Sequence, residues 1–130
     1  MLEKELDEFV KLARKALAES PWASMQNVKT YSVQLASETD EVLEAVSQDD
    51  SESLKAELGD LFWDTLMVML IAERQGWFKP EDSIKEVIEK MKRRKPFLVT
   101  GKKVTLEEEE RIWSEAKTKE NAGKAAAKKK

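Results

Sequence analysis

The stretch from Leu61 to Ala72 constrains the fold most strongly, because only Asp64 and Thr65 interrupt its apolar side chains. A helix that is apolar on nearly every side must be covered by other elements on several sides. A chain of 130 residues and 14.9 kDa forms about one domain and offers few helices for that cover. We therefore expect a second copy of the chain to help bury this stretch, in a homodimer or a dimer of dimers.

The remaining chain has the periodicity of amphipathic helices and very few turn residues, with Gly 4 and Pro 3. Helices are predicted over about residues 2–18, 24–46, 51–75, 80–95 and from 105 onward, with a short loop at Pro21-Trp22. We predict an all-α fold, a four- to five-helix bundle, forming a single domain over residues 1–119. Residues 120–130 are predicted to be a disordered tail or an addition made for expression.

Composition excludes several classes of function. Cys and His are absent, which excludes disulfides, thiolate metal sites and His-based catalysis, and leaves oxygen ligands for a hard ion such as Mg²⁺ or Mn²⁺. Residues 120–130 contain four Lys and one Glu and so carry a net charge of +3. Because the whole chain has a net charge of −3, residues 1–119 carry −6. This acidic balance argues against a nucleic-acid partner. No signal-peptide core or membrane-spanning stretch is found, so we expect a cytoplasmic protein with no membrane partner.

Four carboxylates occupy positions where apolar side chains are expected. Glu38 falls in the apolar stripe of the second predicted helix, and Glu41 follows one turn later. Glu57 lies on the inner line of the third predicted helix, with Asp60 three residues further on. Buried carboxylates repel one another, and a divalent cation removes that penalty. The pattern predicts a metal site; the alternative is that these carboxylates lie on solvated faces of acidic helices.

Two further features leave alternatives open. Asp64 follows Asp60 by one turn, and it either extends the metal site or hydrogen-bonds a Thr or Lys of a partner chain. Among the tryptophans, Trp63 and Trp77 are predicted to pack in the interior, whereas Trp22 and Trp113 are candidates for stacking on a nucleotide base.

The segment from Pro21 to Leu98 resembles the MazG-like nucleoside triphosphate pyrophosphohydrolases of the all-α NTP pyrophosphatase superfamily. The metal signature of that family is Glu-Glu-x-x-Glu followed by Glu-x-x-Asp, and this chain reads Ser-Glu-Thr-Asp-Glu at 37–41 and Glu-Leu-Gly-Asp at 57–60. Ser37 departs from the first Glu of the signature. The resemblance implies that Glu38, Glu41, Glu57 and Asp60 bind the metal.

Other segments are similar to the same family. The stretch at 71–78 resembles its Ile-Ala-Glu-x-x-Gly turn, and Lys-Met-Lys-Arg-Arg-Lys-Pro at 90–96 resembles its Lys-x-x-Arg-Arg-His-Pro segment. Pro21-Trp22 with Gln26 and Lys29 resembles its Pro-Trp-Asp segment, and Trp113 with Lys117 resembles a C-terminal Trp and Lys that contact the nucleotide. The implied substrate-binding residues are Lys90, Arg93, Arg94, Trp22, Lys29, Trp113 and Lys117. A helix-end role in balancing the helix dipole is the alternative for the basic cluster.

The activity implied by the resemblance is Mg²⁺-dependent hydrolysis of a nucleoside triphosphate to the monophosphate and pyrophosphate, with Mn²⁺ as a possible substitute. Glu38 or Glu41 would accept the proton of the attacking water. A narrow-substrate dUTP or dCTP pyrophosphatase of the same superfamily is the first alternative, and a non-catalytic acidic helical interaction module is the second. A phosphoribosyl-ATP pyrophosphohydrolase agrees less well, because the His that such enzymes carry beside their carboxylates is missing.

Overall fold

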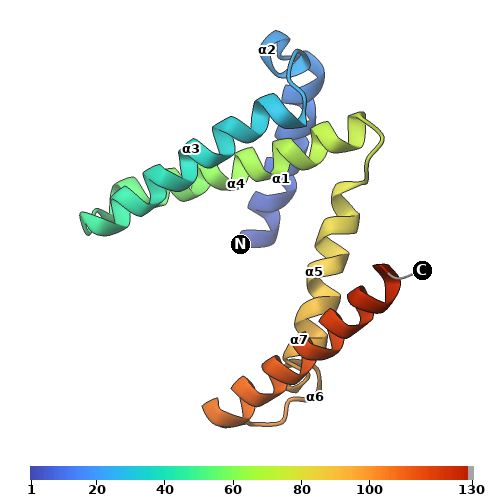
Figure 1. Cartoon of the computed structure of the whole chain (residues 1–130). Coiled ribbons are helices and arrows are strands. Elements are labelled where there is room, and N and C mark those ends of the chain that lie inside the picture. Colours follow the sequence, from blue (N-terminus) through green and yellow to red (C-terminus); the bar gives the residue numbers. More distant parts are fainter. Residues whose placement is uncertain (129–130) are drawn as a thin grey trace. The chain divides into compact units, whose positions relative to one another are not determined.

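A computed structural model describes residues 1–128, and within them all regular secondary structure is helical, which confirms the predicted all-α fold (Figure 1). The helices are α1 (Leu2–Glu19), α2 (Pro21–Ser24), α3 (Val28–Ser47), α4 (Ser51–Arg74), α5 (Pro80–Arg94), α6 (Phe97–Thr100) and α7 (Leu106–Lys128). The chain forms two compact units, Met1–Pro80 and a second that begins at Glu81. The single domain over residues 1–119 stays a prediction.

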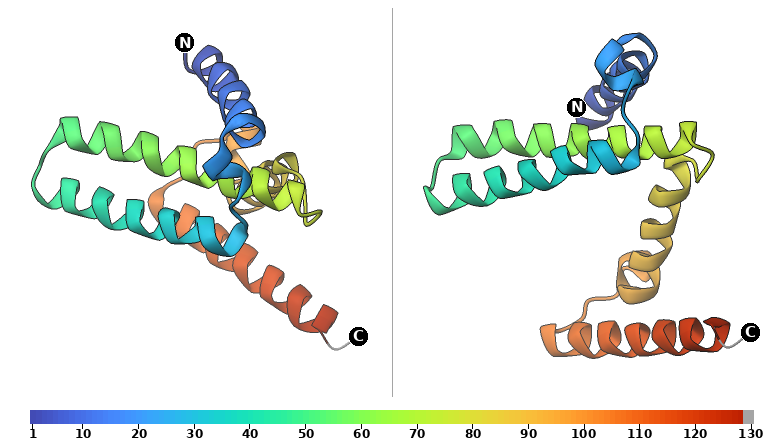
Figure 2. Two further views of the ribbon diagram at one scale, coloured as in Figure 1. Left: turned by 90° about the horizontal axis from the view of Figure 1, so that it is seen from above. Right: turned by 45° about the horizontal axis from the view of Figure 1, so that its top comes forward.

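The first unit is organised around the hairpin of α3 and α4, which run antiparallel side by side (Figures 1 and 2). Helix α1 packs against α4. The core contains the fully buried side chains of Met67, Leu70 and Ile71, together with Ala13 and Tyr31. Each large apolar side chain buried in this way contributes roughly 1.5–3 kcal/mol to folding. This core lies mainly where α1 and α2 cover the hairpin, away from the turn that joins α3 to α4.

Local signals define the ends of the hairpin helices. Asn27 and Thr30 form a reciprocal capping box at the start of α3, with hydrogen bonds of 2.9 Å in each direction. Asp50 accepts a hydrogen bond of 3.1 Å from the Ser53 N–H and so caps α4. Gly76, at φ 80°, follows α4 and confirms the predicted stop at a position that favours glycine.

The connection between α1 and α3 differs from the predicted loop. Pro21–Ser24 forms a turn of helix, α2, and the second predicted helix begins at Val28 instead of about Ser24. Ser20 caps this turn by accepting a 3.2 Å hydrogen bond from the Ala23 N–H, and Pro21 occupies the first helical position, where its missing N–H is tolerated. A capping serine followed by a proline favours the start of a helix, which the prediction of a loop did not take into account.

The second unit contains α5, α6 and α7. Thr105 accepts a 3.2 Å hydrogen bond from the Glu108 N–H, which confirms the predicted start of the last helix. Helix α7 continues to Lys128, so residues 120–128 of the predicted tail are helical, and that they are an addition made for expression stays a prediction. Alanine has the highest helix propensity, and three successive alanines at 125–127 favour continuation of the helix. Residues 129 and 130 of the predicted tail lie outside the described residues.

Candidate metal centre

The α3–α4 hairpin brings three carboxylates together. Glu38 and Glu41 share a face of α3 because they are three residues apart, and Glu57 approaches them from α4. One carboxylate oxygen of each lies within 4.8 Å of the others. Three convergent carboxylates provide the oxygen donors that Mg²⁺ or Mn²⁺ prefers.

The surroundings of these carboxylates also fit a cation. Glu38 Oε2 and Glu57 Oε2 are buried and have no hydrogen-bond partner among the residues that the structure describes. A buried carboxylate oxygen without a partner is destabilising, and a positive ligand between the two glutamates relieves that cost. The donor set therefore matches what a divalent ion requires.

The electrostatics of the cluster show the same strain. Burial is the main cause that raises the pKa of Glu38 to about 7, followed by the neighbouring carboxyl groups of Glu57 and Glu41. The adjacent Glu41 carboxyl is the main cause that raises the pKa of Glu57. The negative charge of Asp60 contributes to both shifts, although Asp60 itself is exposed and lies outside the group of three oxygens.

Solvent reaches the cluster through an adjoining cavity of about 320 Å³. Glu41 and Glu57 lie on its wall, together with Glu44, Gln48 and Ser53. The carboxylates are therefore partly buried and still accessible to an ion or an anionic ligand from one side.

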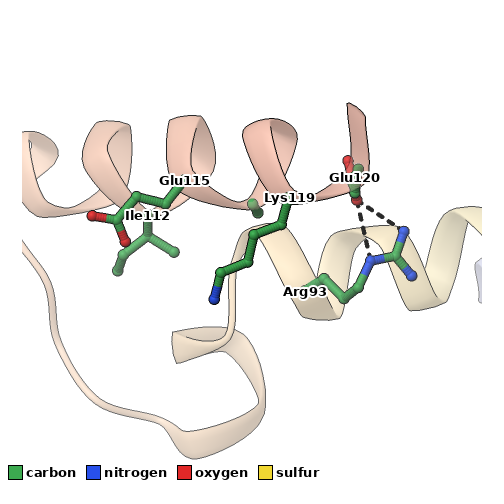
Figure 3. Close-up of a pocket in the computed structure, with 6 residues that line it drawn as sticks. Arg93, Ile112, Glu115, Lys119 and Glu120 are labelled. Carbon is green, nitrogen blue, oxygen red and sulfur yellow. Dashed lines mark hydrogen bonds and ion pairs between the residues drawn. The ribbon is translucent and has the colours of Figure 1, made fainter. Parts of the chain in front are cut away.

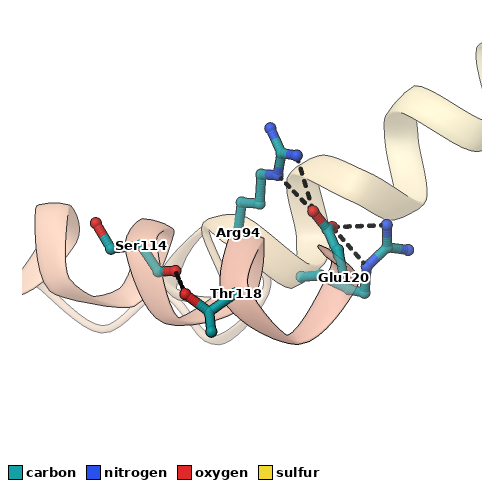
Figure 4. Close-up of polar contacts among 5 residues, drawn as sticks. Arg94, Ser114, Thr118 and Glu120 are labelled. Carbon is teal, nitrogen blue, oxygen red and sulfur yellow. Dashed lines mark hydrogen bonds and ion pairs between the residues drawn. The ribbon is translucent and has the colours of Figure 1, made fainter. Parts of the chain in front are cut away.

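The basic residues predicted to bind phosphate lie on α5, in the second unit. Arg93 donates hydrogen bonds of 3.1 and 2.9 Å to Glu120 Oε1 of α7 (Figure 3). Arg94 donates bonds of 3.1 and 2.8 Å to Glu120 Oε2, close to the hydrogen bond from the Thr118 hydroxyl to the Ser114 carbonyl (Figure 4). These arginines hold the pKa of Glu120 near 2. Both arginines are thus paired with one carboxylate, a contact that the sequence prediction missed.

Trp113 packs beneath the same basic cluster. The Arg94 guanidinium lies 4.8 Å and the Lys95 ammonium 5.7 Å from the centre of its ring. Lys90 is half-buried on α5, and Lys117 is exposed on α7. A cation over the indole face is favourable, so Trp113 supports the basic cluster of this unit.

The other two candidate nucleotide contacts belong to the first unit. Trp22 of α2 is half-exposed, and its ring is tilted against Tyr31 with the ring centres 5.5 Å apart. Lys29 is exposed on the first turn of α3.

The predictions for the two packing tryptophans had different outcomes. Trp63 packs against the core and makes an edge contact with Phe9 at 5.4 Å, as predicted. The prediction that Trp77 packs in the interior is wrong, because 60% of its surface is exposed. Gly76 turns the chain out of α4 just before this residue, so Trp77 no longer follows the apolar face of that helix.

Asp64 has a partner that neither sequence hypothesis included. It is buried, and it accepts a hydrogen bond of 3.1 Å from the Tyr31 hydroxyl across the hairpin. The helical spacing in the sequence contains a signal for this pair. Tyr31 precedes Glu38 by seven residues, and Asp64 follows Glu57 by seven. Seven residues are two helical turns, so each residue shares a face with the glutamate on its own helix.

None of the helices within residues 1–128 is both long enough and apolar enough to cross a bilayer.

Comparison with known proteins identifies the family. A protein-family model described as the MazG nucleotide pyrophosphohydrolase domain matches residues 26–99 of this chain. The nucleoside triphosphate pyrophosphohydrolase of Mycobacterium tuberculosis is 32% identical over 126 residues, which cover 95% of this chain and 39% of that protein. The protein of the same name from Escherichia coli (strain K12) is 31% identical over 106 residues, covering 81% and 40%.

The chain thus spans about two-fifths of the length of these curated relatives. The crystal structure of a mazG-related protein from Thermotoga maritima matches with a TM-score of 0.80 and 38% identity, covering 86% of this chain and 98% of that one. The family model accounts for more than half of the chain and includes all four predicted carboxylates. The chain therefore belongs to the MazG nucleotide pyrophosphohydrolase domain family.

Proposed function

We propose that this chain hydrolyses nucleoside triphosphates to the nucleoside monophosphate and pyrophosphate, with Mg²⁺ as the preferred ion and Mn²⁺ as a substitute. The observation that carries the proposal is the convergence of Glu38, Glu41 and Glu57 within 4.8 Å, with two of their buried oxygens unpartnered. Family membership and the names of the relatives support the same reaction class.

The four carboxylates have two proposed tasks. Glu38, Glu41, Glu57 and Asp60 bind the ion; when bound, a divalent cation supplies positive charge to phosphate oxygens and acidifies water at the site. Glu38 or Glu41 holds a carboxylate oxygen free to accept the proton that the attacking water releases. The adjoining cavity at Glu41 and Glu57 provides the access that a water or phosphate needs.

Several side chains are proposed to contact the substrate. Lys90, Arg93 and Arg94 are proposed to hold the triphosphate by charge-assisted hydrogen bonds. The triphosphate would then take the place of Glu120, whose carboxylate already occupies the donors of both arginines. The remaining proposed nucleotide contacts are Trp22, Lys29, Trp113 and Lys117.

A homodimer or dimer of dimers is proposed as the working form. Large apolar side chains are exposed along both helices of the hairpin, including Val33, Leu43, Leu58 and Phe62, of which 46–67% of the surface is accessible. A second copy packed on these helices would remove that apolar area from water.

A substrate panel tests the proposal. Purified protein is incubated with each ribo- and deoxyribonucleoside triphosphate, with Mg²⁺ or with a chelator, and the products are resolved by anion-exchange chromatography. We expect monophosphate and pyrophosphate to form in equal amounts, and only when the metal is present. Activity confined to one or two substrates would identify the narrow-substrate alternative. Asp60→Asn should nearly abolish the reaction, whereas Asp40→Asn, an exposed position on α3, should not.

The contrary result is equally clear. Product formation that is unaffected by the chelator, or full activity of Asp60→Asn, would refute the proposed metal role. Absence of turnover with every triphosphate would favour the interaction module instead.

A further inference from the structure

The buried polar pair of the hairpin has no part in the chemistry proposed above. Asp64 is 9% exposed and Tyr31 is 3% exposed. Among the residues that the structure describes, Asp64 is the one charged residue that is buried. Burying a carboxylate here is costly, and replacing buried charged groups by apolar side chains of similar volume is often neutral or stabilising. The pair therefore calls for a role other than raising stability.

Its position in the hairpin indicates that role. Tyr31 lies two turns before Glu38 on α3, and Asp64 lies two turns after Glu57 on α4. Because the helices are antiparallel, the Tyr31–Asp64 hydrogen bond and the close approach of Glu38 to Glu57 lie along the same interface between α3 and α4. The two contacts are about 10 Å apart along the helix axes. A slip of α3 by one turn against α4 would break the Tyr31–Asp64 hydrogen bond. It would also displace Glu38 by about 5 Å along the helix axis from its present position beside Glu57.

The supports on either side of the carboxylates differ. On one side the turn at Asp49 and Asp50 connects the helices covalently, and Asp50 caps α4. On the other side Tyr31 belongs to the packed core with Met67 and Leu70, so its hydroxyl has a fixed position. Between these two supports the three carboxylates repel one another, which opposes the close approach of the helices.

We propose that Tyr31 and Asp64 form a cross-helix pin that fixes the register of α3 against α4 and so positions Glu38, Glu41 and Glu57 for a divalent cation. This inference rests on the proposed metal site. Tyr31 and Asp64 are positioning residues, and neither contacts the ion or the substrate. A hydrogen bond suits this task because it weakens steeply when its atoms move apart or out of line, whereas apolar contacts are non-directional and tolerate sliding.

The pin predicts a specific ranking of variants. Tyr31→Phe keeps the ring and removes the hydroxyl, and should weaken Mn²⁺ binding by about tenfold, the lower end of what groups beyond the ligands contribute. Asp64→Asn keeps an oxygen acceptor for the Tyr31 hydroxyl and should bind Mn²⁺ nearly as well as the wild type. The double variant Tyr31→Phe/Asp64→Leu should fold with good stability and still bind Mn²⁺ weakly.

The experiment is a titration of the full chain with Mn²⁺ alone, by calorimetry or by the electron paramagnetic resonance of free Mn²⁺, with thermal unfolding recorded in parallel. Thr65→Val is the matched control, since it removes a part-buried hydroxyl next to Asp64 that bonds within α4, to the Leu61 carbonyl at 2.8 Å. Its affinity for Mn²⁺ should equal that of the wild type.

Each contrary outcome points to a different error. Wild-type affinity in both Tyr31→Phe and the double variant overturns the pin, even if their melting temperatures change. An Asp64→Asn variant as weak as Tyr31→Phe shows that Asp64 acts through its charge, and also overturns it. A wild-type protein that binds no Mn²⁺ refutes the metal site of the proposed function, and the pin with it.

Discussion

Neutralising Glu38 should stabilise the metal-free protein at and above neutral pH. Burial and the nearby carboxyl groups of Glu57 and Glu41 raise the pKa of Glu38 from 4.5 to about 7. The folded state therefore binds this proton more tightly than the unfolded state does. By linkage, the contribution to stability is complete below pH 4.5 and is lost as the pH rises from 4.5 through 7.

The size of this effect follows from the shift. One unit of pKa corresponds to about 1.4 kcal/mol, and solvent screening at a partly exposed group reduces what is realised, which leaves about 1–2 kcal/mol. For a domain of this size that free energy corresponds to roughly 3–8 °C in melting temperature. Glu38→Gln removes the titrating group and should lose less stability than the wild type over the same pH interval.

Thermal unfolding followed by circular dichroism in metal-free buffer measures the difference. The melting temperatures of the wild type, Glu38→Gln and the control Asp40→Asn are compared from pH 4.5 to pH 8, the interval in which linkage acts. Asp40 is exposed on the same helix, so its variant controls for the loss of one negative charge. If Glu38→Gln and Asp40→Asn follow the same pH profile, the reasoning about the carboxylate cluster is refuted.

Three further predictions concern the basic cluster, the core and assembly. Lys90→Ala should lower kcat/KM for the triphosphate about 10- to 100-fold, through a lost charge-assisted bond of ~1.5–3 kcal/mol, with Mn²⁺ affinity unchanged; unchanged kcat/KM, or an equal loss in a Lys85→Ala control, would contradict a triphosphate contact at Lys90. Met67→Ala should reduce the free energy of unfolding in urea by about 2–5 kcal/mol, against less than ~1 kcal/mol for Leu12→Ala at an exposed position of α1; equal losses would contradict the assigned core. Sedimentation should give at least twice 14.9 kDa, and a monomer at micromolar concentration would contradict the proposed oligomer.

The sequence predicted the parts of the site that depend on one helix at a time. The i, i+3 spacing places Glu38 beside Glu41 whatever the rest of the chain does, and the apolar stripes determine which face turns inward. The caps at Asp50 and Thr105 are local signals of the same kind, because a cap is formed by residues that are neighbours in the sequence.

Contacts between helices were harder to predict. The Tyr31–Asp64 bond and the pairing of Arg93 and Arg94 with Glu120 join residues that are 26–33 positions apart. Such contacts depend on helix register and crossing, which residue patterns constrain only weakly. The helix over residues 120–128 was not predicted, although the alanines of this segment favour helix.

The most direct test of the metal centre measures Mn²⁺ binding and Mg²⁺-dependent pyrophosphate release in the same preparations of wild type, Glu57→Gln and Glu86→Gln. Glu86 is an exposed glutamate on α5 and controls for the loss of charge. We predict that Glu57→Gln loses both binding and hydrolysis while Glu86→Gln keeps both, since Glu57 contributes one of three convergent carboxylates. A Glu57→Gln variant that still binds Mn²⁺ and releases pyrophosphate at the wild-type rate would contradict the account.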